Sequence, residues 1–176
     1  CQNMTVQLDA TGKVSIRSSD IDNGSNDACG IDSLSLSQTN YNCANVGVNP
    51  VILTATDNNG NTNSCSATVT VEDTVPPVAL CQNIAIHLDG TGNAGISATD
   101  IDNGSSDACG IDTLRIGLSS LNCSNVGSNL VILYVRDVNG NISTCTANVQ
   151  VVDTVPPVAI CQDLTVQLDS SGNRNV

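Results

Sequence analysis

Two acidic segments carry the residues best suited to holding a cation. Asp20–Asp32 and Asp100–Asp112 differ at one position, Asn26 against Ser106, and each contains four carboxylates, an Asn-Gly turn and one cysteine. Close carboxylates repel one another unless a cation or wide solvation separates them. Their hard oxygens are also the ligands that calcium prefers. The candidate calcium ligands in these segments are Asp20, Asp22, Asp27, Asp32, Asp100, Asp102, Asp107 and Asp112.

Four further carboxylates lie in expected turns and linkers and complete the candidate set: Asp57, Asp73, Asp137 and Asp153. The order Asp-x-Asp-Asn-Gly is similar to the start of an EF-hand loop, but the closing bidentate Glu is missing. The alternative is a solvated turn in which the Asp side chains accept hydrogen bonds from local amides. The pattern leaves both interpretations open, and calcium is the cofactor that we expect.

The nine cysteines form two equally spaced sets of four and one remainder, Cys161. Four cysteines allow three connectivities. If the strands run up and down, the first and last strands of a unit begin at the same end, and the other two cysteines of the unit then close the acidic segment over the third strand. The expected disulfides are Cys1–Cys65, Cys29–Cys43, Cys81–Cys145 and Cys109–Cys123. A zinc site is disfavoured because the sequence has no Cys-x-x-Cys pair and one histidine, His87.

The elements that position these residues repeat along the chain. Cys1-Gln-Asn recurs as Cys81-Gln-Asn and as Cys161-Gln-Asp, at an offset of 80 residues. Apolar residues alternate with polar ones within each repeat, as in Met4–Leu8, and no capped helix is visible. This period of two predicts strands with one buried face. We therefore expect an all-β fold of tandem Ig-like antiparallel β-sandwich repeats that form a rod.

Two Asp-Thr-Val-Pro-Pro segments, which begin at Asp73 and Asp153, mark the boundaries, because paired prolines end strand pairing. We predict repeats at 1–75 and 76–155, and the start of an incomplete third repeat at 156–176. We interpret the chain as a window from a longer array. Residues 161–176 supply one strand and a turn, which cannot bury an apolar face alone.

Several ordered motifs resemble the hyalin-repeat (HYR) family over the whole chain. They include Cys81, Asp107-Ala-Cys-Gly110, Asp137-Val-Asn-Gly-Asn141, Thr144–Val149 and the linker that begins at Asp153. An added Asn-Cys-x-Asn-Val-Gly motif is similar to tandem arrays in giant adhesins of Bacteroidota. The resemblance implies an extracellular adhesion protein without catalysis of its own. One departure is that many HYR domains carry a cysteine near the position of Ile96, and this chain has none there.

Composition limits the classes of partner. Five basic residues against seventeen acidic ones disfavour nucleic acid and anionic membranes, since both need a cationic face. No apolar run reaches the ~18 residues of a membrane span. The cysteine content indicates an oxidising compartment, so we expect a secreted or cell-surface protein. His87 aligns with Gln7 and Gln167, and a glycosidase cleft usually has aromatic residues, so we expect no enzyme.

The function that we infer from the sequence is a structural stalk of an adhesin or an extracellular filament. The alternative is a repeated carbohydrate- or protein-binding module, which would repeat its exposed site in every copy. The expected partners are neighbouring repeats of the same chain, other copies in a fibre, and an unidentified surface glycan or protein. We also expect calcium at the joint between repeats, where Glu72 and Asp73 approach Asp100, Asp102 and Asp137.

Overall fold

The computed structural model describes residues 1–168 and 170–173, and two successive parts of the chain contain the same elements in the same order. The first part contains β1 (Met4–Gln7), β2 (Lys13–Ser15), α1 (Ser18–Ile21), β3 (Ile31–Leu36), β4 (Asn40–Asn42), η1 (Cys43–Asn45), β5 (Gly47–Asp57) and β6 (Thr62–Glu72). The second contains β7 (Ile84–His87), β8 (Asn93–Gly95), α2 (Ala98–Ile101), β9 (Ile111–Ile116), β10 (Ser120–Asn122), η2 (Cys123–Asn125), β11 (Gly127–Asp137) and β12 (Ile142–Val152). The expectation of an all-β fold is confirmed.

Each part has a four-stranded sheet and a two-stranded sheet. The order is β1-β6-β5-β3 with β2-β4 in the first part, and β7-β12-β11-β9 with β10-β8 in the second. The expectation of purely antiparallel sheets is wrong, because β1 pairs with β6 in parallel, and β7 with β12. The first strand enters from the same end as the last strand, and this common direction makes their pairing parallel.

The core follows the alternation of the sequence. Val131, Leu133 and Val135 of β11 are buried, whereas Ile132 and the other residues between them face outward. In each part, one face of the long hairpin, β5–β6 or β11–β12, packs against the smaller sheet and the helical turn. The core contains aliphatic side chains and one large aromatic side chain, Tyr41, which is 2% exposed.

Two single helical turns were not expected from the sequence. In α1, the Asp20 carboxylate accepts a hydrogen bond of 2.7 Å from the Arg17 amide. In α2, Asp100 accepts one of 2.7 Å from the Ser97 amide. Both turns bury one isoleucine, Ile21 or Ile101, completely. A four-residue turn is too short to show the 3.6-residue period by which helices are predicted.

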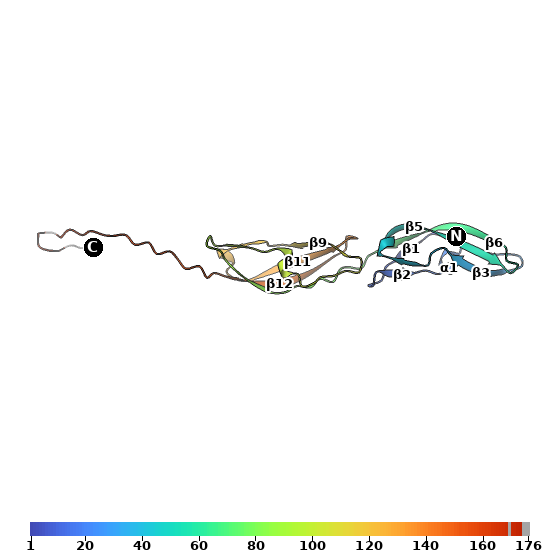
Figure 1. Ribbon diagram of the computed structural model, residues 1–176, viewed down its shortest axis with the longest axis horizontal. Coiled ribbons are helices and arrows are strands. Elements are labelled where there is room, and N and C mark those ends of the chain that lie inside the picture. Colours follow the sequence, from blue (N-terminus) through green and yellow to red (C-terminus); the bar gives the residue numbers. More distant parts are fainter. Residues whose placement is uncertain (169, 174–176) are drawn as a thin grey trace.

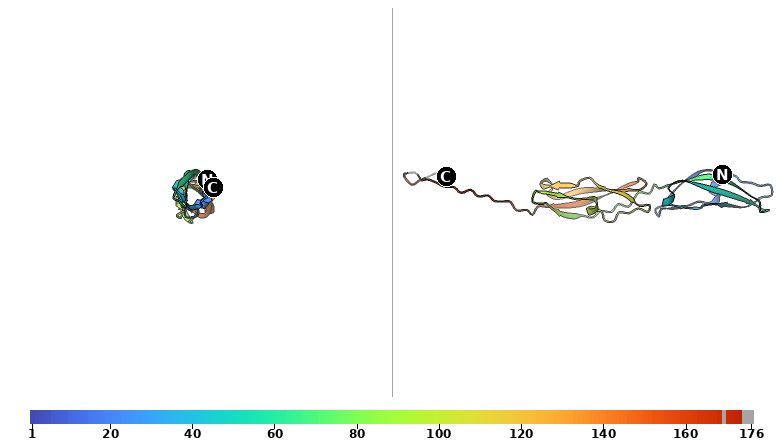
Figure 2. Two further views of the ribbon diagram at one scale, coloured as in Figure 1. Left: turned by 90° about the vertical axis from the view of Figure 1, so that its right-hand side faces the viewer. Right: turned by 45° about the horizontal axis from the view of Figure 1, so that its top comes forward.

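Figures 1 and 2 show the two groups of strands end to end along the long axis of the molecule. The chain after β12 leads away from the second group. Among the described residues from 154 to 173, none belongs to a strand and all are exposed. The predicted third-repeat segment also includes Asp169 and residues 174–176, which lie outside the described residues.

None of the helices in residues 1–168 and 170–173 is long and apolar enough to cross a membrane.

Candidate functional site at the joint between the repeats

The two strand groups meet at a joint in which the linker after β6 lies against the acidic segment of the second group. The Val78 amide donates to the Ser106 carbonyl at 2.8 Å, and the Ser106 amide donates back to Val78 at 3.0 Å. The Asn103 amide donates to the Leu80 carbonyl at 2.9 Å, and the Leu80 amide donates to the Ser105 hydroxyl at 3.0 Å. The linker is therefore held as an extended edge on the second group, which restricts its freedom to bend.

Asn141 fixes the start of this linker. Its side-chain amide donates to the carbonyls of Asp73 and Val75 at 3.1 and 3.3 Å, and to the Asp137 carboxylate at 2.8 Å. The Asp137 carboxylate also accepts from the Asn139 and Asn141 amides at 2.9 and 2.8 Å. These contacts satisfy a carboxylate that is 0% exposed. The turn after β11 thus holds the preceding linker through one asparagine side chain.

A disulfide between Cys43 and Cys109 also ties the two groups together, with their Cα atoms 5.2 Å apart. Gly12 lies directly beneath it: a Cβ at this position would come within 2.6 Å of the Cys43 sulfur and 3.2 Å of the Ala108 Cβ. The φ of Gly12 is +70°, which glycine adopts without a steric penalty. The glycine therefore allows the acidic segment of the second group to lie close to the first.

The structure contains both expected disulfides between first and last strands, Cys1–Cys65 and Cys81–Cys145. The expected pairs Cys29–Cys43 and Cys109–Cys123 are wrong. Cys43 lies in η1, before β5, whereas the carbonyl of Cys29 accepts a hydrogen bond of 2.7 Å from Asn58, after β5. The eleven residues of β5 separate the two cysteines by about 35 Å at ~3.3 Å per residue. Cys29, Cys123 and Cys161 are unbonded and exposed.

Most of the twelve candidate calcium ligands are engaged in local hydrogen bonds. In the first acidic segment, Asp20 accepts from Arg17, Asp22 from Gly24 and Ser25, and Asp27 from Cys29. Hydrogen bonds from the Ser25 hydroxyl and amide hold the pKa of Asp22 below its ordinary value. Asp32 is an exposed residue of β3. The segment is thus divided among a helical turn, an Asx-type turn and a strand.

The second segment shows the same division. Asp100 accepts from Ser97, Asp102 from Ser105 and Gly104, and Asp107 from Cys109, while Asp112 lies 3.7 Å from Arg136. Hydrogen bonds from the Ser97 amide and hydroxyl lower the pKa of Asp100. Burial raises the pKa of Asp102, but hydrogen bonds from Ser105 and Gly104 outweigh this effect, so that the net pKa is lowered.

The turn residues Asp57 and Asp137 occupy equivalent positions. Each carboxylate accepts a hydrogen bond of 2.8 Å from the side-chain amide of the asparagine four residues later, Asn61 or Asn141. Hydrogen bonds from the Asn61 side chain and amide lower the pKa of Asp57. Asp153 accepts from the Val155 amide at 3.0 Å. The interpretation of these Asp residues as acceptors for nearby amides therefore describes the observed contacts.

Within the described part of the chain, one group of three acidic or thiol side chains has ligand atoms within 4.8 Å of one another: Asp73, Asp107 and Cys109. The Cys109 sulfur is in a disulfide, so it is not a thiolate that could bind a metal. Asp73 is 9% exposed, and its Oδ2 atom is buried without a hydrogen-bond partner. Asp73 thus approaches the next acidic segment at Asp107, and the Asn141 side chain connects the Asp73 carbonyl to the expected Asp137 carboxylate.

No family model matches the sequence, and no curated protein matches it. The structure is similar to extracellular cadherin domains 1–4 of protocadherin gamma B7 (TM-score 0.37, 12% identity, covering 86% of this chain and 49% of that one). It is also similar to fibronectin(III)-like modules of Clostridium thermocellum CbhA (TM-score 0.35, 9% identity, 92% and 96% covered). The chain spans about half the length of the protocadherin gamma B7 fragment. Neither similarity assigns a ligand or an activity to this chain.

Proposed function

We propose that this chain consists of hyalin-repeat-like spacer modules from the stalk of an extracellular adhesin or surface filament. The observation that carries this proposal is the joint, where backbone hydrogen bonds at Val78 and Ser106 and the Cys43–Cys109 disulfide hold successive modules end to end. A binding domain on a flexible tether has no need of two such connections. A stalk needs them because lateral bending at each joint shortens the span.

The disulfides support an extracellular location and a mechanical role. Cys1–Cys65 and Cys81–Cys145 each close a loop with a sequence separation of 64 residues, which cannot extend under load while the bond is intact. Disulfides persist in oxidising compartments outside the cytosol. Each stalk module would therefore resist lengthening even if its strands separate.

Single-molecule pulling from the two ends tests this function. Reduction should add about 220 Å of extension for each module, from 64 residues at ~3.5 Å per residue. In the oxidised chain, this extension should be absent. Equal extension of both forms would contradict the proposal, since the disulfides would then carry no load.

We also propose that calcium binds at the joint, where Asp73 and Asp107 supply two carboxylates and water supplies further ligands. The buried, unpartnered Oδ2 of Asp73 supports this proposal, because such an oxygen is costly without a hydrogen bond or a cation. When bound, the ion would offset the repulsion between carboxylates of two modules. Two protein carboxylates form a weak site by comparison with the six to eight oxygens around calcium.

Calorimetric titration of the full chain with calcium and with magnesium tests this site. Asp73→Asn should remove the calcium heat, whereas Asp153→Asn, the equivalent change in the exposed second linker, should retain it. Calcium heat that survives Asp73→Asn would place the ion elsewhere.

The alternative, a binding module, has one favourable observation. A pocket on the second module is lined by Arg115, Tyr134 and Arg136, whose side chains suit an anionic or sugar ligand. The equivalent residues of the first module are Ser35, Thr54 and Thr56. Because the pocket residues are not repeated, we favour the stalk function. A glycan array that detects binding by the chain but not by Tyr134→Thr would support the alternative.

A further inference from the structure

The two ends of the described fold carry complementary halves of the joint that lies between its modules. Cys29 occupies the position of Cys109, and Cys123 occupies the position of Cys43, both at the repeat offset of 80 residues. The inner pair, Cys43 and Cys109, is bonded, whereas Cys29 and Cys123 are exposed thiols. We infer that each module forms a disulfide with the module before it, through the cysteine at the position of Cys29 and Cys109. It forms another with the module after it, through the cysteine at the position of Cys43 and Cys123.

The unbonded thiols already have the local geometry of the bonded pair. The Cys43 and Cys123 sulfurs lie 3.7 and 3.6 Å from the carbonyls of Gly12 and Gly92, respectively. A Cβ on either glycine would come within 2.6 Å of the neighbouring sulfur. Among the described residues, the only atom outside the turn itself that lies within 4 Å of the Gly92 Cβ position is the Cys123 sulfur, so no contact there corresponds to those of Gly12 with Ala108 and Cys109. The surface around Cys123 is therefore preformed for the loop that carries the next cysteine.

The loop that carries Cys29 is preformed in the same way. The amides of Cys29 and Cys109 each donate to the carboxylate two residues earlier, Asp27 or Asp107, at 2.7 Å. Cys29 is followed by Gly30, with φ +97°, just as Cys109 is followed by Gly110, with φ +108°. The turn at Cys29 therefore already has the conformation of the bonded turn at Cys109, and a disulfide can form there without rearranging it.

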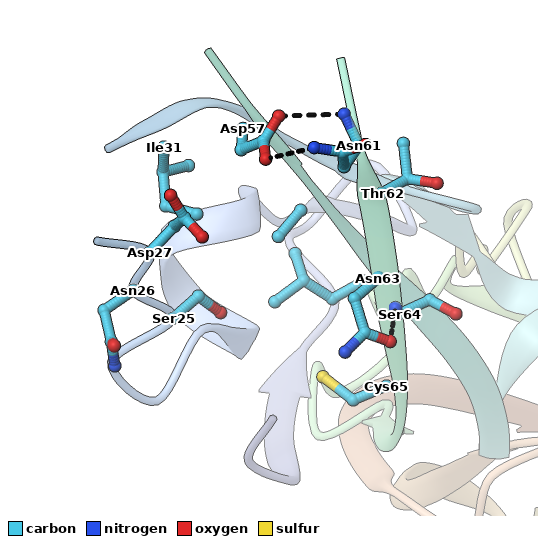
Figure 3. A pocket seen from close by; sticks show the side chains of 12 residues that line it. Ser25, Asn26, Asp27, Ile31, Asp57, Asn61, Thr62, Asn63, Ser64 and Cys65 are labelled. Atoms are coloured by element: carbon cyan, nitrogen blue, oxygen red, sulfur yellow. Dashed lines mark hydrogen bonds between the residues drawn. The ribbon is translucent and has the colours of Figure 1, made fainter. Parts of the chain in front are cut away.

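A pocket beside the Cys29 loop lies where the second module binds the linker after β6. It has a volume of about 360 Å³, and Figure 3 shows it between Ser25–Asp27 on one side and Asn61–Cys65 on the other. The equivalent residues of the second module, Ser106 and Asn141, bind the linker after β6. The occupant that fits this pocket is thus an extended Asp-Thr-Val-Pro-Pro linker from a preceding module.

Differences between equivalent residues support this assignment. Asp137 and Val135, beneath the inner linker, are both 0% exposed, whereas Asp57 and Ala55, at the open pocket, are partly exposed. The Ser105 hydroxyl lies against Leu80 of the linker, while the Ser25 hydroxyl donates to Asp22 of its own turn. The first module therefore resembles the second with its linker removed.

The second linker is the matching free half. It repeats Asp73–Pro77 as Asp153–Pro157, and its Asp likewise accepts from the amide two residues later, at 3.0 Å in both cases. Val158 and Ile160 are 87% and 90% exposed, whereas Val78 and Leu80, which pair with the second module, are 57% and 45% exposed. This linker repeats residues 73–79 and has Ile160 in place of Leu80, and its residues from 154 to 160 are all exposed.

Formation of the bond converts two thiols into one disulfide, and two protons and two electrons leave with it. A small-molecule disulfide such as oxidised glutathione accepts them and becomes two reduced thiols. The chemistry is that which forms Cys43–Cys109. Each joint of an array would then have a covalent crosslink in addition to its peptide linker.

The test is a chain in which a copy of residues 81–160 is added before Cys1, so that its linker leads into the open pocket. After refolding in a glutathione buffer, the added module should bond its Cys123 to Cys29. The number of free thiols should remain three, as in the present chain. If the bond does not form, two more thiols will be free, and this result would overturn the inference.

Two variants of the extended chain serve as controls. Cys29→Ser should add one free thiol and remove the linked peptide from a digest made without reduction. Cys29→Ser combined with Ala28→Cys moves the thiol by one residue and should also fail to bond, because only the Cys29 position has the observed geometry. Equally efficient bonding from position 28, or crosslinks mainly between molecules, would show unspecific thiol pairing and contradict the inference.

Discussion

At the residue scale, the joint depends on an asparagine whose side chain serves two purposes. Asn141 bonds Asp137 in its own turn and two carbonyls of the preceding linker, whereas Asn61 bonds its own Asp57. The chain thus provides a matched pair of positions. The difference between substitutions at these two sites isolates the contribution of the linker contacts.

Asn141→Ala should loosen the linker, because two hydrogen bonds worth roughly 0.5–1.5 kcal/mol each are lost. Amide hydrogen exchange at Val78 and Ser106 should accelerate by about tenfold. Asn61→Ala removes the same bond within the turn but should leave exchange at these two amides unchanged. Equal effects of both substitutions would show that Asn141 acts only within its own turn.

The lowered pKa values of exposed turn carboxylates also have a consequence for acid stability. The pKa values of Asp9, Asp57 and Asp89 lie below the ordinary value, chiefly because the side chains of Thr11, Asn61 and Thr91 donate to the ionised form. The ionised carboxylates therefore stabilise the fold. This contribution is present above the ordinary Asp pKa of ~3.9 and is lost as the pH falls through the lowered folded values.

The melting temperature should accordingly be constant from about pH 7 to 5 and fall below about pH 4. The net charge of −12 has the opposite effect, because protonation relieves repulsion. The measurement is therefore made in about 1 M salt, where the screening length is ~3 Å. A melting temperature that rises between pH 4 and 2.5 under these conditions would contradict the assignment of these hydrogen bonds.

At the element scale, the strands could be predicted from the sequence, but the parallel pairing of β1 with β6 and the residues that bond across the joint could not. Alternation along β11 identified Val131, Leu133 and Val135 as the buried face, because burial of one sheet face is a local property. The turn α2 could not be predicted in this way, because its four residues span a single helical period of 3.6 residues and show no repeat. The Cys43–Cys109 bond depends on how two modules meet, which spacing within one module does not determine.

Gly12 and Gly92 each lie opposite the third cysteine of their module, a relation that the structure shows and that spacing along the chain does not. The sequence shows these glycines as turn residues, while the structure shows why a side chain is excluded: the cysteine sulfur lies 2.6 Å from the position of a Cβ. Calcium ligation was expected from the density of Asp residues. The structure shows that neighbouring amides account for most of these carboxylates, an alternative that turn chemistry already favours.

Gly12→Ala should weaken the Cys43–Cys109 bond. Both Gly12→Ala and Gly92→Ala incur about 1 kcal/mol or more of backbone strain at positive φ. At Gly12, the added methyl group also meets a sulfur that is fixed in a disulfide, whereas the Cys123 thiol is free to rotate. In a glutathione buffer, the reduced fraction of Cys43 and Cys109 should rise at least fivefold for Gly12→Ala.

The matched substitution at Gly92 controls for backbone strain. It should leave the reduced fraction of Cys43 and Cys109 close to that of the unmodified chain. An equal rise for both variants would indicate that strain in the turn, rather than contact with the disulfide, determines its stability.

At the scale of the whole molecule, the account rests on a fixed, end-to-end joint. The linker after β6 is hydrogen bonded to the second module, and the Cys43–Cys109 disulfide joins the two modules by a second, covalent attachment. Two attachments oppose bending more strongly than the peptide linker does alone. The proposed stalk function, the calcium site and the crosslinks to further modules all require this geometry.

Small-angle X-ray scattering from the oxidised chain tests this geometry most directly. We use a form in which Cys29, Cys123 and Cys161 are serine, so that molecules cannot crosslink, and compare it with the same form carrying Cys43→Ser and Cys109→Ser. Eleven-residue strands at ~3.3 Å per residue place the module centres about 40 Å apart. The pair-distance distribution should show a distinct shoulder near this distance, which should broaden when the joint disulfide is removed. A single compact maximum without the shoulder, or identical profiles for the two forms, would contradict the account.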